Sequence, residues 1–191
     1  LVIKANIQPG QTVLINDICT GVAQAVYHIC RYRSCPVWVV CSVAKRAWVH
    51  ENLGIELDCI FDSPINPLLR DSVLESTDGE GVDIVVCSSE QSVVAVDFNL
   101  LKRFGHFCTV TQSGKRDIFS GTCLQIAAKK HVSVHFCDAI AMLACPRLCE
   151  QLQLSVEEGL SSGEVVPLKC RVHHEVESAL LAAQNRTHPE A

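Results

Sequence analysis

The sequence predicts a single doubly wound α/β domain, a Rossmann-like parallel sheet with helices on both faces. Strand-like and helix-like segments alternate from near the start of the chain to its end. The strand-like runs are continuously apolar, as in parallel strands that are buried on both faces. No internal repeat, low-complexity tract or linker interrupts the pattern, and 191 residues is the length of one ordinary domain.

In the first half, β-branched and apolar runs mark the strands, and Gly or Pro marks where helices end. Thr12–Asn16 is the first such run, Pro36 precedes the second, and Gly54 stops the helix after it. The expected strands here are 12–16, 37–41, 59–61 and 82–87. The expected helices are 21–32, 44–53 and 68–75, the last ended by the turn at 78–81.

In the second half, the same alternation continues after a helix expected at 92–102. The expected strands are 105–110, 131–136 and 165–170, with a polar loop at 111–117. The expected helices are 123–129, 146–159 and 176–183.

Composition excludes several classes of protein. The hydrophobic fraction of 48% excludes a disordered chain, and the net charge of −5 argues against a dedicated nucleic-acid binder. Charged residues or glycine interrupt every apolar stretch before it reaches the length of a bilayer span, and the start has no signal-peptide pattern. We therefore expect a cytoplasmic protein without membrane association. Because the sequence has no initiator Met, we also interpret it as a piece of a longer chain.

The 12 cysteines lack the paired spacing of zinc ligands, and most lie inside apolar runs. Free cysteine packs as a small hydrophobe, so we expect mainly buried, reduced thiols and no metal site. Cys145 and Cys149 share a helical face without a histidine at ligand spacing, and we expect them to pack in the core.

The turn after the first strand has the spacing of a dinucleotide-binding turn but few of its residues. The three glycine positions of G-x-G-x-x-G/A fall on Ile18, Thr20 and Ala23, and only Ala23 is an accepted occupant. Ile18 is stiff and resists a positive φ, Thr20 puts a side chain where a phosphate meets bare backbone, and Asp17 adds negative charge. Gly21 still opens the helix, followed by Val22, and the N-terminus of that helix suits an anion. An ordinary strand–loop–helix connection is the alternative.

After the second strand, Ser42, Lys45 and Arg46 stand where an NAD-binding protein has an acidic residue. Cations at this position favour a 2′-phosphate, and a solvated basic pair in the first turns of a helix is the alternative.

Several stretches together resemble one family, in the family's order. They are Gln8–Ile15, Ser42–Trp48, Gly79–Val85, Phe104–Phe107, Gly114–Ile118 and Pro167–Leu168. This series is similar to the nucleotide-binding half of the enoyl reductase domains of polyketide and fatty acid synthases, which are medium-chain reductases. The closest resemblance is to fungal highly reducing iterative polyketide synthases, the multifunctional enzymes of secondary metabolism. The resemblance implies NADPH as the cofactor, and Ser42 as a residue near its 2′-phosphate.

The departures from the family are as informative as the matches. The proposed proton-donor pair of the family maps onto Lys45, which is retained, and onto Ile65, where the acidic residue is lost. The family's Gly-Gly-Val-Gly turn is Thr20-Gly21-Val22-Ala23 here, Cys87-Ser88 replaces its Asn-Ser, and the late Gly-Lys tail is replaced at 185–190. The substrate-binding half that precedes this domain in the family is absent from the sequence.

These features lead to a hypothesis of a non-catalytic enoyl reductase domain with no tightly bound cofactor. It would serve as a spacer, dimer contact or docking face in a synthase whose enoyl reduction is absent or supplied in trans. The alternative is an active NADPH-dependent enoyl reductase that reduces enoyl thioesters on an acyl carrier, with Lys45 binding the cofactor or supplying the proton. A free-standing nucleotide-sensing or interaction module is a third interpretation.

The expected partners follow from the same resemblance. They are the other domains of a parent synthase, its acyl carrier domain, a trans-acting enoyl reductase and a second copy of the chain. The family pairs through a late strand, which matches His131–Phe136, and its alternating pattern suits an edge that needs a partner. An ordinary covered edge strand is the alternative.

Overall fold

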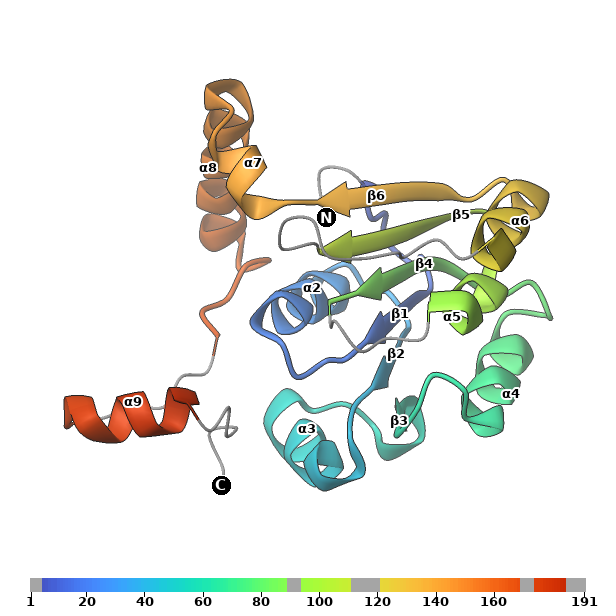
Figure 1. The fold of residues 1–191 in the computed structure, drawn as a ribbon, viewed down its shortest axis with the longest axis horizontal. Helices are drawn as coiled ribbons and strands as arrows, with labels where there is room; N and C mark the ends of the chain where they lie inside the picture. The colour runs from blue at the N-terminus through green and yellow to red at the C-terminus, as the bar shows by residue number, and fades with distance from the viewer. Residues whose placement is uncertain (1–4, 89–93, 111–120, 169–173, 185–191) are drawn as a thin grey trace.

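The computed structural model describes residues 5–88, 94–110, 121–168 and 174–184. A six-stranded parallel sheet has the order β3-β2-β1-β4-β5-β6, so the chain crosses over once between its two halves (Figure 1). This is the strand order of a dinucleotide-binding fold, with the switch point between β1 and β4. The predicted fold class is confirmed.

The first half of the chain forms the β1–β3 side of the sheet. Strand β1 is Val13–Asn16, β2 is Val37–Val40 and β3 is Ile60–Phe61. Helix α2 spans Gly21–Tyr32, the short 3-10 turn η1 Val43–Lys45, α3 Arg46–Leu53 and the 3-10 turn η2 Leu57–Cys59. Gly54 ends α3 in the left-handed conformation, with φ of 68°, as its sequence position predicts.

The second half forms the β4–β6 side. Helix α4 is Pro67–Ser76, β4 Val82–Cys87, α5 Val94–Leu100, β5 Leu101–Val110, α6 Gly121–Lys130 and β6 Ser133–Cys137. Three further helices follow: α7 at Ala139–Leu143, α8 at Pro146–Ser162 and α9 at Val176–Gln184. The sequence did not predict α7.

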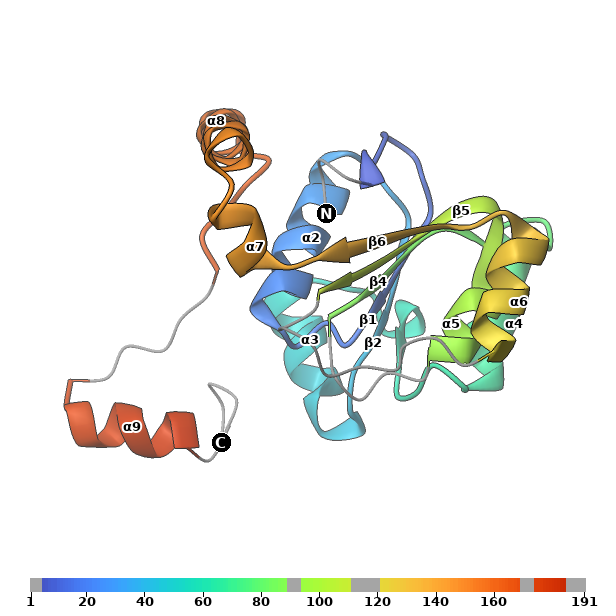
Figure 2. The same ribbon diagram turned by 45° about the horizontal axis from the view of Figure 1, so that its top comes forward.

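Two apolar layers hold the sheet. One lies under α2 and α3 and includes Ile15, Val39 and Val86, whereas the other lies under α4, α5 and α6 and includes Leu14, Val85 and Phe107 (Figure 2). Neighbouring residues of β1 therefore point into opposite layers, and all four residues of this strand are buried. Burial on both faces explains why the strand sequences are continuously apolar.

The predicted helix at 92–102 is too long at its C-terminal end. Leu101 and Lys102 begin β5, where Leu101 pairs with Val82 before the register shifts. Phe104 absorbs this irregularity with a left-handed φ of 61°. Apolar periodicity alone could not place the boundary, because Leu100 ends the helix, Leu101 begins the strand and both are buried.

The strand predicted at 165–170 is wrong for its described part, residues 165–168, which are irregular. Val165 N donates to the Gly159 carbonyl at 2.9 Å, and the Val165 side chain packs where Gly159 leaves room. The chain therefore turns back onto the end of α8 instead of extending along a strand neighbour. Residues 169 and 170, like the loop predicted at 111–117, lie outside the described residues.

Most cysteines pack as expected. Those buried in the described parts of the chain are Cys30, Cys35, Cys41, Cys87, Cys108, Cys123 and Cys137. Cys145, which caps α8, and Cys149 within that helix were expected to pack in the core. This expectation is wrong, because Cys145 is exposed and Cys149 is only half-buried. Helix α8 stands beside the end of the sheet and not on it, so its cysteine face has no core to join (Figure 1).

Two absences apply to the described ranges alone. Within them, no group of three or more His, Cys, Asp or Glu side chains is placed to hold a metal ion. No helix in the same ranges is both long enough and apolar enough to cross a membrane.

Gly81 offers a direct test of the junction between β4 and β5. Its φ is +95°, and a Cβ added there would lie 2.3 Å from the Leu100 carbonyl oxygen. We expect Gly81→Ala to lower the free energy of unfolding by more than about 2 kcal/mol, measured by chemical denaturation. Gly121→Ala is the matched control, because a Cβ there meets open space, and its effect should stay within about 0.5 kcal/mol. Equal effects of the two substitutions would contradict the close approach.

Candidate functional site

The turn between β1 and α2 lies at the carboxyl end of the central strand, where this fold binds its ligands. Asp17, and not Ile18, takes the left-handed conformation, with φ of 63°. Its carboxylate accepts a hydrogen bond from Cys19 N at 3.2 Å, a local turn that Asp tolerates well. The positive φ of this turn thus falls on Asp17, and Ile18, which was expected to resist one, does not adopt it. Ile18 is fully buried, and its N–H donates to the Val40 carbonyl at 3.0 Å.

Thr20 caps α2 with its side chain. Its Oγ1 accepts from Ala23 N at 3.2 Å and donates to Ser88 Oγ at 2.8 Å, while Ser88 Oγ donates to the Asp17 carbonyl at 3.0 Å. A Thr at this position satisfies an amide that has no partner within the helix. The hydroxyl therefore takes up one of the donors that would otherwise point at an anion.

Leu168 covers the start of the same helix. A Cβ at Gly21 would lie 3.2 Å from Leu168 Cδ1, so this side chain is in contact with the glycine. The segment that carries Leu168 is held to α2 by an ion pair between Glu164 and Arg33, and Arg33 also donates to the Ile7 carbonyl. Val22, next to Gly21, is exposed, and Ala23 is fully buried. Leu168 of the late Pro-Leu pair thus packs against the start of α2, whereas Pro167 is exposed.

The three residues predicted after β2, Ser42, Lys45 and Arg46, have different surroundings. Ser42 is exposed and precedes η1, where its carbonyl accepts from Lys45 N at 2.9 Å. Lys45 lies near Cys19 and Cys41. Its positive charge is one of the influences on the pKa of each thiol, and it acts to lower both. Arg46 instead donates from Nη2 to the Leu57 carbonyl at 2.7 Å. Of the two cations, Lys45 is the one that the fold brings to the nucleotide turn.

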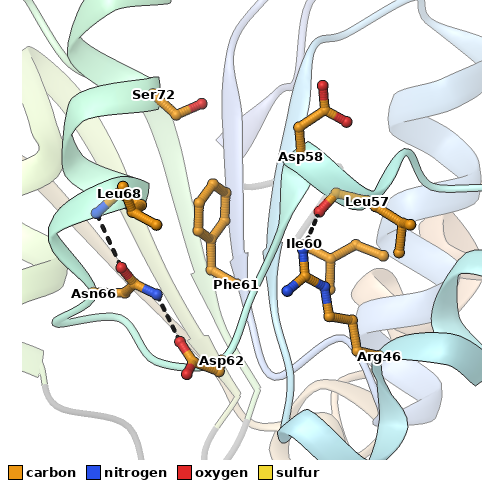
Figure 3. A pocket seen from close by; sticks show the side chains of 9 residues that line it. All are labelled: Arg46, Leu57, Asp58, Ile60, Phe61, Asp62, Asn66, Leu68 and Ser72. Carbon is orange, nitrogen blue, oxygen red and sulfur yellow. Dashed lines mark hydrogen bonds between the residues drawn. The ribbon is translucent and has the colours of Figure 1, made fainter.

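A pocket of about 330 Å³ opens at the β3 edge of the sheet, between η2 and the start of α4. Figure 3 shows the Arg46 side chain on one wall and Asn66 on the other, where Asn66 bridges Asp62 and Leu68 N at 2.7 and 2.9 Å. Its lining residues are Arg46, Leu57, Asp58, Ile60, Phe61, Asp62, Asn66, Leu68 and Ser72. Ile65 is not among them, and its side chain is exposed.

A buried polar pair beneath the turn was not found from the sequence. Asp97 of α5 is fully buried, and Asn16 at the end of β1 donates to its carboxylate at 3.0 and 3.2 Å. Burial raises the pKa of Asp97 to about 7, although the hydrogen bond from Asn16 opposes this shift. A single Asp in the apolar stretch 93–98 was the available signal. The helical pattern of the stretch does not by itself show that this Asp is buried.

No family model matches the sequence. The chain is 35% identical over 140 residues to a highly reducing polyketide synthase of Emericella nidulans, which covers 72% of the chain and 5% of the relative. It is 28% identical over 190 residues to one of Fusarium mangiferae, covering 96% of the chain and 8% of the relative. The chain thus spans less than a tenth of the length of these relatives.

Two solved structures identify the matching part. The CurK enoyl reductase superposes with a TM-score of 0.73 at 25% identity, over 97% of this chain and 54% of that one. The nucleotide-binding subdomain of the enoylreductase domain of PpsC from Mycobacterium tuberculosis gives 0.65 at 25% identity, over 87% and 92%. The chain is related to the enoyl reductase domains of polyketide synthases. Its match falls on their nucleotide-binding half, which confirms the resemblance found in the sequence.

The buried Asp97 predicts a specific dependence of stability on pH. Its pKa is about 7 when folded and near 3.8 when exposed, so between these values the folded state holds a proton that the unfolded state has released. Stability should therefore fall as the pH rises through this window, by on the order of 1 kcal/mol per pH unit.

Asp97→Asn keeps an acceptor for Asn16 and cannot titrate, so the fall should disappear. Denaturant unfolding of both proteins from pH 4 to pH 8 measures the difference, in which the titration of all other groups cancels. Parallel pH profiles for the two proteins would show that Asp97 is ionised throughout.

Proposed function

We propose that this chain is the nucleotide-binding half of an enoyl reductase domain in a fungal highly reducing polyketide synthase, and that this half no longer binds NADPH. Its role is structural: it is a spacer, dimer contact or docking face, and enoyl reduction is absent or supplied in trans. The observation that carries the proposal is that two backbone N–H groups of the first turn are already hydrogen-bonded to side chains of the chain itself. Asp17 and Thr20 accept from Cys19 N and Ala23 N, two backbone amides of the connection that carries the phosphate contact in this fold.

The residues of the turn do not fit a pyrophosphate. Binding at a helix N-terminus depends on backbone N–H groups that point at the anion and on the positive end of the helix dipole. Here the Thr20 hydroxyl already satisfies the Ala23 amide, and the Leu168 side chain lies against Gly21. The Asp17 carboxylate adds repulsion, because two negative charges in a partly buried turn disfavour each other.

The residues expected to donate a proton are also incomplete. Lys45 supplies a cation beside the turn, but the position that carries an acidic residue in the family is Ile65, whose side chain cannot titrate. Ile65 is 62% exposed, in a loop that Asn66 and Asp62 fix by a hydrogen bond. A lone ammonium without its acidic partner supports a domain that does not protonate an enolate.

An active, NADPH-dependent enoyl reductase is the second candidate. Two observations favour it: Ala23 is an accepted third residue of the fingerprint, and Lys45 lies on the turn side of η1. In this case the whole synthase, reconstituted without a partner reductase, makes the saturated product. The proposal of an inactive domain requires the unsaturated product from the same experiment.

Titration calorimetry with NADPH tests the nucleotide turn itself. We expect no saturable heat for the natural chain, and binding at least about tenfold tighter for the double variant Asp17→Gly/Thr20→Gly. Glycine suits the left-handed φ at position 17 and releases the Ala23 amide from its cap. Thr20→Ser is the matched control, because its hydroxyl keeps the cap and should leave the titration unchanged. Low-micromolar binding by the natural chain would contradict the proposal.

We also propose that the parent protein is a homodimer that uses β6, and that the remaining partners are other domains of the synthase, including its acyl carrier. Strand β6 is the outer strand of the sheet and pairs only with β5 within the described residues (Figure 1). Ser133 and Phe136 on this strand are exposed. An open edge with an exposed aromatic side chain supports pairing with a second copy.

Phe136→Lys tests this edge without disturbing the core. A charge on the edge opposes pairing, so the molar mass from light scattering should shift from dimer toward monomer. Leu124→Lys, on α6, replaces a comparably exposed apolar residue away from the edge and should leave the mass unchanged. If both variants keep the mass of the natural chain, β6 is not the contact.

A further inference from the structure

Two cysteines far apart in the sequence meet beside the nucleotide turn. Cys19 lies in that turn and Cys41 directly follows β2, and their side chains are hydrogen-bonded to each other. The backbone brings them together independently, because Ile18 N donates to the Val40 carbonyl at 3.0 Å. Cys19 follows Ile18 and Cys41 follows Val40, so this backbone hydrogen bond places the two cysteines next to each other.

The two thiols differ in their surroundings and so in their chemistry. The Cys19 thiol donates to Cys41, which lowers the pKa of Cys41 and raises that of Cys19. The cations of Lys45 and Arg46 also favour a thiolate at Cys41, whereas burial and the Asp17 carboxylate oppose it. Cys19 is partly exposed, and Cys41 is 4% exposed. A thiol of lowered pKa with a second thiol as its immediate neighbour is the arrangement that redox-sensitive cysteine pairs use.

A second thiol pair in the same domain provides the contrast. Cys30 and Cys35 are also hydrogen-bonded to each other, and Cys35 N donates to the Cys30 carbonyl at 2.9 Å. Burial raises the pKa of both of these thiols, Cys30 to about 12. Both pairs are thus close together, and of the four thiols only Cys41 has a lowered pKa.

We propose that Cys19 and Cys41 are a redox-active dithiol that a peroxide converts to an intramolecular disulfide. The Cys41 thiolate attacks one peroxide oxygen, the O–O bond breaks, and the sulfur becomes a sulfenic acid while hydroxide leaves. The Cys19 sulfur then attacks the Cys41 sulfur, giving its proton to the departing oxygen, and water leaves. Overall two thiols and one hydrogen peroxide give one disulfide and two waters, so the thiols lose two electrons that the peroxide gains.

The disulfide would tie the turn between β1 and α2 to the chain segment that carries Lys45. It would therefore fix the loop conformation at the switch point of the sheet. The inference does not depend on whether this half binds NADPH, since it uses only contacts within the chain.

Intact-mass spectrometry after treatment with hydrogen peroxide tests the pair. The natural chain should lose two hydrogens, and a reductant should restore them. Cys30→Ser should behave like the natural chain. Cys19→Ser should form no disulfide and carry added oxygen at Cys41, whereas Cys41→Ser should form neither the disulfide nor an oxygen adduct at Cys19, because the attacking thiolate is gone. Loss of the disulfide in Cys30→Ser but not in Cys19→Ser would overturn the proposal, as would a natural chain that gains oxygen without forming any disulfide.

Peptide mapping of the natural chain keeps the test independent of the variants. Trypsin leaves Cys19 and Cys30 in the peptide 5–31, and Cys35 and Cys41 in the peptide 34–45. Fragmentation between the two cysteines of each peptide therefore distinguishes a bond between Cys19 and Cys41 from one between Cys30 and Cys35. Only the first supports the proposal, and the second, or any other pairing, contradicts it.

Discussion

Strand β1 is the constraint on which the rest of the structure depends. It pairs with β2 on one side and β4 on the other, and its four residues are buried between two layers of helices. A strand enclosed in this way can change neither its register nor its direction without exposing apolar side chains on both faces. The position of its carboxyl end is therefore fixed, and with it the turn that leads into α2.

At that turn, the backbone amides can be satisfied by a bound anion or by the chain itself, but not by both at once. Asp17 and Thr20 accept from Cys19 N and Ala23 N, and Thr20 is linked to β4 through Ser88. The same contacts make the connection stable without a ligand, and under the proposed function they compete with a pyrophosphate for these donors.

The carboxyl ends of β1 and β2 also concentrate groups with altered ionisation. Cys41 has a lowered pKa because Cys19 donates to it, and Asp97 has a raised pKa because it is buried beneath Asn16. These groups lie on different sides of β1 and respond to different conditions, one to oxidants and the other to pH. The edge of the sheet where this fold binds its ligands therefore carries ionisable groups of its own.

The sequence by itself determined the fold class, most element positions and the resemblance to enoyl reductases, because continuous burial and helix-ending residues leave local patterns. It also predicts that Thr20 hinders a pyrophosphate, since a side chain replaces a glycine there. Only the tertiary structure decided that Asp17 and not Ile18 takes the left-handed conformation. It also decided that residues 165–168 form no strand, with Val165 packed on the end of α8 and Leu168 against Gly21. Only the tertiary structure joined Cys19 to Cys41 and Asn16 to Asp97. Such contacts depend on how segments distant in sequence are placed side by side, and a local sequence pattern does not predict that placement.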